Sequence, residues 1–127
     1  MKTLKVLYMN ADSLINKHVK LETFLNDRLY KPDIIGIVEV KANNCTVFPQ
    51  ISEFALDSYD VCYVNLDNVY GRGVLLYTAL WMNVSPYIPD GPALDSVWIT
   101  IKLLEKDRLI IGCIYRSLSS SAMMILI

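Results

Sequence analysis

The stretch Lys31-Pro32-Asp33-Ile34-Ile35-Gly36-Ile37-Val38-Glu39 determines the expected fold of this chain. Between the Pro-Asp start and the final carboxylate lie five residues, of which four are large and apolar. A short continuous apolar run rich in isoleucine and valine is typical of a strand that is covered on both faces. Glu39 follows at its carboxyl end, which is where ligands bind in open α/β sheets. The sequence therefore predicts a buried strand that presents an acid to a metal or a substrate; the alternative is a solvated glutamate that begins a loop.

A strand, a loop and a helix precede this stretch. The apolar segment Leu4-Lys5-Val6-Leu7-Tyr8-Met9 predicts a first strand that ends at Asn10. Helical periodicity follows, and the helix should end near Tyr30 because Pro32 disfavours helical geometry in the residue before it. The apolar face of this helix is formed by Leu21, Phe24, Leu25 and Leu29. A strand, a crossover helix and a second strand predict a parallel pair, with Asn10 and Glu39 at the same end.

Two antiparallel hairpins are predicted downstream. In the first, residues 59–64 and 74–79 flank a glycine-containing turn at 67–73. In the second, residues 96–102 and 108–115 flank a tighter turn.

The remaining segments predict connections and one terminal element. Residues 43–58 show no clear period and read as a surface connection. Pro86, Pro89, Gly91 and Pro92 predict a loop between the hairpins. The serines at 119–121 predict the cap of a helix that begins at the carboxyl end of the sequence.

Length and composition restrict the class of protein. A chain of 127 residues suits one domain, and a hydrophobic content of 54% argues against disorder. The net charge of -1 argues against a basic surface that coats polyanions, although a metal ion can supply positive charge locally. The three cysteines show no Cys-x-x-Cys spacing, which favours neither a zinc site nor a disulfide framework. With no membrane span or signal peptide apparent, an intracellular protein without a membrane partner is expected.

Several stretches, taken together and in this order, resemble the endonuclease/exonuclease/phosphatase superfamily. The resemblance is closest to the apurinic-endonuclease-like domain of non-LTR (LINE-type) retrotransposons. The stretches are residues 8–14, 32–39, 71–74, 96–98 and 111–116. The resemblance implies a four-layer α/β sandwich (α+β in broad class), hydrolysis of phosphodiester bonds with Mg²⁺, and DNA as partner. It also implies a nuclear location if the chain belongs to an active retroelement.

The resemblance assigns roles to five residues. Asn10 matches the asparagine that orients groups around the metal, Glu39 the magnesium ligand, and Tyr115 the tyrosine that contacts the scissile phosphate. Asp12 matches a position close to the metal in some relatives, and Arg116 is placed to pair with phosphate. These types suit the chemistry, because Mg²⁺ prefers hard oxygen ligands and keeps most of its waters.

Each of these residues also has a simpler interpretation. Asn10 alone is most often a turn former, Tyr115 and Trp98 are typical packing residues of strands, and Arg116 can be a solvated strand end. Arg72 and its flanking glycines are interpreted as a hairpin turn that requires positive φ.

The sequence departs from the family in its catalytic groups. The family's later aspartate and asparagine and its closing aspartate-histidine pair have no counterparts, and the only histidine, His18, lies at the start of the predicted helix. We therefore expect roughly the first half of such a domain, inactive alone, with an apolar sheet face left uncovered and available for association. The alternatives are a non-catalytic remnant that binds protein or nucleic acid, and a reading frame with no stable product.

Overall fold

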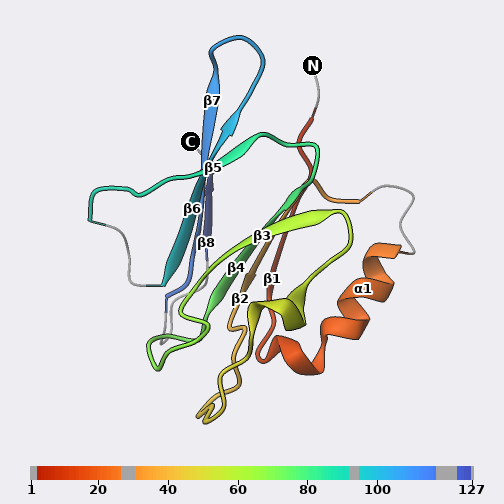
Figure 1. Cartoon of the computed structure of the whole chain (residues 1–127), viewed down its shortest axis with the longest axis vertical. Coiled ribbons are helices and arrows are strands. Elements are labelled where there is room, and N and C mark those ends of the chain that lie inside the picture. Colours follow the sequence, from red (N-terminus) through yellow and green to blue (C-terminus); the bar gives the residue numbers. More distant parts are fainter. Residues whose placement is uncertain (1–2, 27–30, 92–94, 117–122, 127) are drawn as a thin grey trace.

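The computed structural model describes residues 3–26, 31–91, 95–116 and 123–126. These residues form two four-stranded sheets, which we call the first and second sheet, with strand orders β1-β2-β4-β3 and β5-β6-β7-β8 (Figure 1). In chain order the elements are β1 (Val6–Asn10), a 3-10 helix (Leu14–Asn16), α1 (His18–Asn26), β2 (Ile34–Val38), a 3-10 helix (Ile51–Phe54), β3 (Tyr59–Val64), β4 (Val74–Ala79), β5 (Val84–Pro86), β6 (Ser96–Lys102), β7 (Arg108–Ile114) and β8 (Met123–Leu126). The predicted mixture of helix and strand is confirmed at this level.

The first sheet is built around β2, as the apolar run predicted. All five residues of β2 are buried, and β1 runs parallel to it with Asn10 opposite Val38. On its other side β2 pairs antiparallel with β4, which forms the predicted hairpin with β3. The end of the helix near Tyr30 lies outside the described residues.

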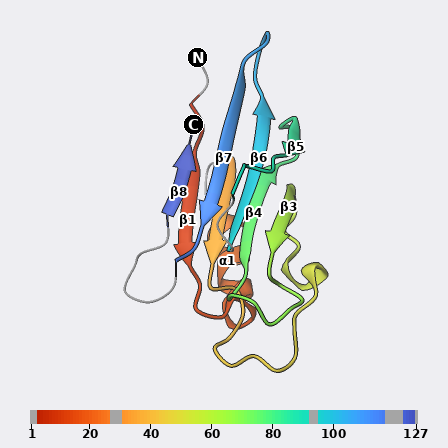
Figure 2. The ribbon, with the colours of Figure 1, turned by 90° about the vertical axis from the view of Figure 1, so that its left-hand side faces the viewer.

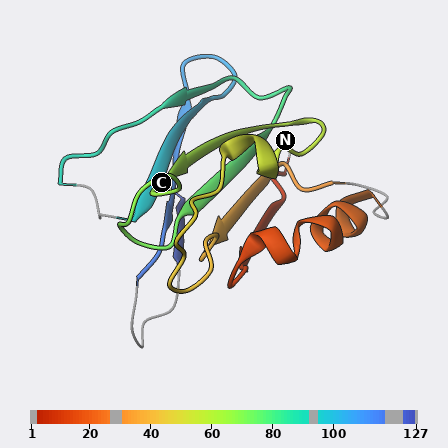
Figure 3. The ribbon, with the colours of Figure 1, turned by 60° about the horizontal axis from the view of Figure 1, so that its bottom comes forward.

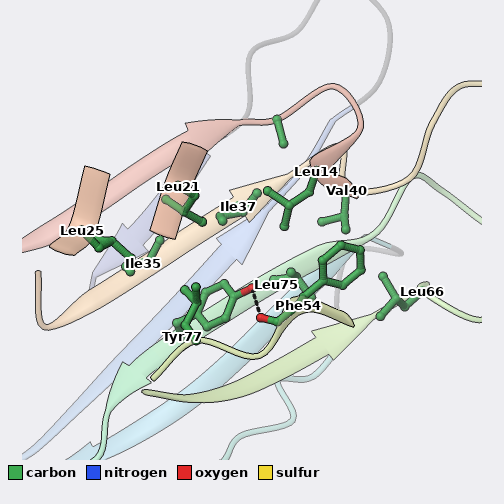
Figure 4. Packing of buried hydrophobic residues seen from close by; sticks show 12 residues of the cluster. Leu14, Leu21, Leu25, Ile35, Ile37, Val40, Phe54, Leu66, Leu75 and Tyr77 are labelled. Atoms are coloured by element: carbon green, nitrogen blue, oxygen red, sulfur yellow. Dashed lines mark hydrogen bonds between the residues drawn. The ribbon is translucent and has the colours of Figure 1, made fainter. Parts of the chain in front are cut away.

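One face of the first sheet packs against α1 and the second 3-10 helix. Figure 3 shows these two elements on the same side of the strands. Leu21 and Leu25 of α1 join Ile35, Ile37 and Phe54 in one buried cluster (Figure 4). The phenol of Tyr77 in β4 donates a hydrogen bond of 2.8 Å to the carbonyl of Phe54, so the segment 43–58, expected to be a surface connection, contributes to the core.

The other face of the first sheet packs against the second sheet. The shared core contains Ile34, Val38, Val74 and Leu76 from β2 and β4, and Val97, Ile99, Ile101, Ile111 and Cys113 from β6 and β7. The expectation that the chain leaves the first sheet uncovered is therefore wrong. The predicted second hairpin (β6 and β7) turns its alternate apolar residues inward and supplies the cover.

Two strands of the second sheet were not expected. β5 pairs with β6 within the predicted loop, where Pro86 is tolerated because β5 is the edge strand that begins the order given above. Residues 123–126 form β8, antiparallel to β7, so the prediction of a terminal helix is wrong. The serines at 119–121 lie outside the described residues. Pairing with the edge of β7 outweighs the weak helical preference of this short apolar segment.

Within the described ranges, no helix has both the length and the apolar character that spanning a membrane requires.

Candidate functional site

The site lies where β1, β2 and β7 end. Figure 2 shows the arrowheads of these three strands at the same end of the molecule. Parallel pairing continues past β1 and β2. The amide of Ala11 donates to the carbonyl of Val38 at 2.9 Å, and the amide of Ser13 donates to the backbone carbonyl of Glu39 at 2.9 Å. Glu39 has a left-handed backbone with φ of 53°, and the chain after it stays hydrogen-bonded on both sides, because the amide of Leu14 donates to the carbonyl of Val40 at 2.8 Å and that of Lys41 to the carbonyl of Arg72 at 2.8 Å. Tyr115 follows β7 directly.

The carboxylate of Glu39 contacts two different segments. Its Oε1 lies 2.9 Å from Nη1 of Arg72, and its Oε2 accepts a hydrogen bond from the hydroxyl of Tyr115. The Glu39 side chain is only 16% exposed, so both oxygens find protein partners in a region of limited solvent. The hydrogen bond to Glu39, followed by burial, raises the pKa of Tyr115 above its usual value. The structure thus brings together two of the residues that the resemblance selected, from strands of different sheets.

Arg72 is the residue of this cluster that sequence reasoning placed elsewhere. Gly71 and Gly73 have φ of 59° and 87°, which confirms the predicted turn. However, the arginine side chain reaches into the site, where Nη2 lies 2.7 Å from Oδ1 of Asp12. Its Nε and Nη2 also donate to the carbonyl of Lys41 at 3.2 and 3.0 Å. The available signal in the sequence was a charged residue two positions before β4, the strand that pairs with β2.

Asp12 and Asn10 shape the loop after β1. The amide of Asp12 donates to Oδ1 of Asn10 at 3.1 Å, so the side chain of Asn10 acts here as a turn former. Asp12 itself is 70% exposed. The hydrogen bond from Arg72, together with its charge, lowers the pKa of the Asp12 carboxyl. The Nζ of Lys17 donates to the carbonyl of Ala11 and lies 3.5 Å from that of Asp12, so a second cation borders this loop.

Arg116 lies outside the cluster. It is exposed, and it forms no ion pair with any residue that the structure describes. The structure therefore places it as a solvated residue after β7.

Two further residues near the site were given no role by the resemblance. Asp95, 8% exposed, accepts hydrogen bonds from the side-chain amide of Asn65 at 3.0 Å and from the backbone amide of Arg72 at 3.3 Å. Its backbone carbonyl accepts a hydrogen bond from the amide of Tyr115 at 2.9 Å. Asp95 therefore binds the backbone amides of both Arg72 and Tyr115, the two residues whose side chains contact Glu39. Its one sequence signal is its position immediately before β6.

The other residue without an assigned role is Tyr8, which begins the matched stretch 8–14. Its hydroxyl is buried and has no hydrogen-bond partner among the described residues. Burial, with a smaller contribution from Cys113 and then Glu39, raises the pKa of Tyr8 to about 12. Tyr8 is therefore a neutral polar group beside the carboxylate, and it had no distinguishing signal within an apolar strand.

The donor set fits a magnesium ion. Glu39 and Asp12 supply hard carboxylate oxygens, and Mg²⁺ is commonly held by one or two carboxylates while it keeps several waters. Over the described ranges, no group of three or more His, Cys, Asp or Glu side chains gathers into a larger metal site. Arg72 now neutralises the two carboxylates that would hold the ion.

The contacts of the only histidine, His18, are with residues outside this cluster. Nε2 of His18 lies 3.1 Å from Oε1 of Glu22 within α1, and its ring packs edge-on against Phe54 on the helical side of the first sheet. Comparison with known proteins adds no assignment, because no family model and no curated protein matches this sequence.

Proposed function

We propose that this chain is the amino-terminal part of a magnesium-dependent phosphodiesterase of the endonuclease/exonuclease/phosphatase type, acting on DNA. The observation that carries the proposal is the convergence of separate motifs on one carboxylate. Residues 32–39 supply Glu39, residues 111–116 supply Tyr115, and residues 8–14 supply Asp12, which Arg72 links to Glu39. The stability of the fold does not by itself require that a tyrosine hydroxyl and an arginine guanidinium contact the same carboxylate at the end of a strand.

The proposed architecture is a four-layer sandwich, of which this chain forms roughly the first half. Two facing sheets with α1 on the outer face of the first support three of the layers. The fourth layer would cover the outer face of the second sheet, on which Trp98 lies half-buried.

In this proposal Glu39 and Asp12 would hold Mg²⁺. The ion, when bound, would stabilise negative charge that develops on the phosphate. Tyr115 holds the Glu39 carboxylate in its orientation, and the same O–H would donate to a phosphate oxygen after leaving Glu39, because a phenol has one proton to donate. Asn10 fixes the loop that carries Asp12.

The isolated chain is proposed to be inactive. The sequence has no counterpart of the family's later aspartate or of its closing aspartate-histidine pair, and His18 is paired with Glu22 in α1. Loss of members of a catalytic unit lowers rates by several orders of magnitude. Metal binding without turnover is therefore the expected behaviour.

The test combines metal binding with DNA cleavage. We expect the wild-type chain to bind Mn²⁺, measured by electron paramagnetic resonance, and Glu39→Gln to weaken binding at least about tenfold through loss of a charged ligand. Glu105→Gln is the matched control, because Glu105 is exposed in the β6–β7 turn. Equal Mn²⁺ affinity in wild type and Glu39→Gln would contradict the proposed metal site.

With Mg²⁺, the wild-type chain should leave supercoiled and abasic plasmid DNA intact. Nicking that depends on Mg²⁺ and is abolished by Glu39→Gln would contradict the proposed inactivity while supporting the site.

A further inference from the structure

Each of the three guanidinium nitrogens of Arg72 contacts a protein oxygen. Nη1 contacts Glu39 at 2.9 Å, Nη2 contacts Asp12 at 2.7 Å, and Nε and Nη2 donate to the carbonyl of Lys41. One cation therefore satisfies both carboxylates that are proposed to hold the metal. Its position is not that of a surface arginine, because the side chain is only 23% exposed.

The backbone around Arg72 fixes this arrangement. Its amide donates to the buried carboxylate of Asp95 at 3.3 Å, and its carbonyl accepts the amide of Lys41 at 2.8 Å. Gly71 allows the close approach, because a Cβ at this position would lie 2.6 Å from Oδ2 of Asp95. The turn is therefore built to direct the guanidinium between the two acids.

We propose that Arg72 competes with a divalent metal ion for Glu39 and Asp12, so that metal binding requires the guanidinium to release at least one carboxylate. The inference rests on the proposed function, in which these two residues are the metal ligands. Arginine keeps its charge at all accessible pH values, so it cannot vacate the site by deprotonation. A metal ion and a guanidinium on the same carboxylate compete for its oxygen lone pairs and repel each other as like charges.

The test compares Mn²⁺ affinity among charge-matched variants. Removal of a half-buried competitor should tighten Mn²⁺ binding by roughly tenfold in Arg72→Gln. Lys17→Gln removes a neighbouring cation that contacts backbone carbonyls and no carboxylate, and its effect should stay below about threefold. Arg108→Gln, exposed at the opposite end of β7, should leave the affinity unchanged. Circular dichroism checks that each variant keeps the wild-type fold.

A measurement on the wild-type chain keeps the proposal testable if Arg72→Gln does not fold. The Nε–H of Arg72 donates to Lys41, and its NMR resonance should shift as Mg²⁺ saturates the site. An unmoved resonance at saturation, with the Glu39 amide shifted, would overturn the competition and leave the proposed metal site intact. Equal Mn²⁺ affinity of the wild type and Arg72→Gln would also overturn the competition and leave the proposed metal site intact. Absence of Mn²⁺ binding in every folded variant would overturn both the competition and the proposed function.

Discussion

Gly112→Ala should destabilise the chain through one defined clash. Gly112 lies opposite Trp98 in the β6–β7 pair, and a Cβ on Gly112 would lie 2.5 Å from Cε3 and Cζ3 of the indole. Ordinary carbon contacts need about 3.5 Å, so the ring must move by about 1 Å. The ring is held by its Nε1, which donates to Oγ of Ser96 at 3.0 Å, and by the Tyr87 ring at a centroid distance of 6.4 Å. Overpacking of this kind costs about 1–3 kcal/mol.

A double-mutant cycle measured by urea unfolding and circular dichroism isolates this clash. Gly112→Ala should lower the free energy of unfolding by about 1–3 kcal/mol in the wild type. In a Trp98→Ala background the same change should be neutral or stabilising by up to about 1 kcal/mol, because alanine loses less conformational entropy than glycine in a strand. Equal losses in the two backgrounds would refute the reasoning, since the indole would then not be the cause.

Three further outcomes follow from the buried polar groups. Tyr77→Phe leaves the carbonyl of Phe54 without its 2.8 Å donor and should cost about 1–3 kcal/mol in urea unfolding, and an unchanged midpoint would contradict this. Burial raises the pKa of Cys113 to about 12 and also raises that of Tyr77, so these groups stay neutral in the folded chain while the unfolded chain ionises. The free energy of unfolding should therefore fall between pH 8 and pH 10.5, and a flat or rising profile would count against that burial. Asp95→Ala removes the acceptor for the Arg72 amide and should cost about 1–3 kcal/mol, with loss of protection from hydrogen exchange at that amide as the specific readout.

The sequence predicts the first sheet well, because its signals are local. The continuous apolar run at 34–38, the helical period after Asn10 and the crossover length together require a parallel pair. The structure confirms that pair and both hairpins.

The edges of the second sheet could not be predicted in the same way. β5 has three residues and contains Pro86, and β8 has four apolar residues, so neither carries a period of its own. Both become strands because a neighbour offers unpaired backbone groups. The packing of the second sheet onto the first is likewise a tertiary property, and for this reason the expected uncovered face was wrong.

The site shows the same division between local and distant signals. Glu39, Asn10 and Tyr115 stand at strand ends within recognisable motifs. Arg72 contacts Asp12 across 60 residues of sequence, and its amide contacts Asp95 across 23. Only the register of β4 against β2 and the approach of β6 bring these groups together, and no local pattern encodes either.

The carboxylate of Glu39 joins elements of both sheets, since Arg72 belongs to the turn before β4 and Tyr115 follows β7. Sliding of one sheet over the other must therefore break a contact of Glu39. The shared core between the sheets, including Ile99, resists this motion and thereby prolongs the contact of Glu39 with Tyr115, whereas Arg72 moves with Glu39 because β2 and β4 are paired in one sheet. Relaxation dispersion at Tyr115 should therefore report the relative motion of the sheets.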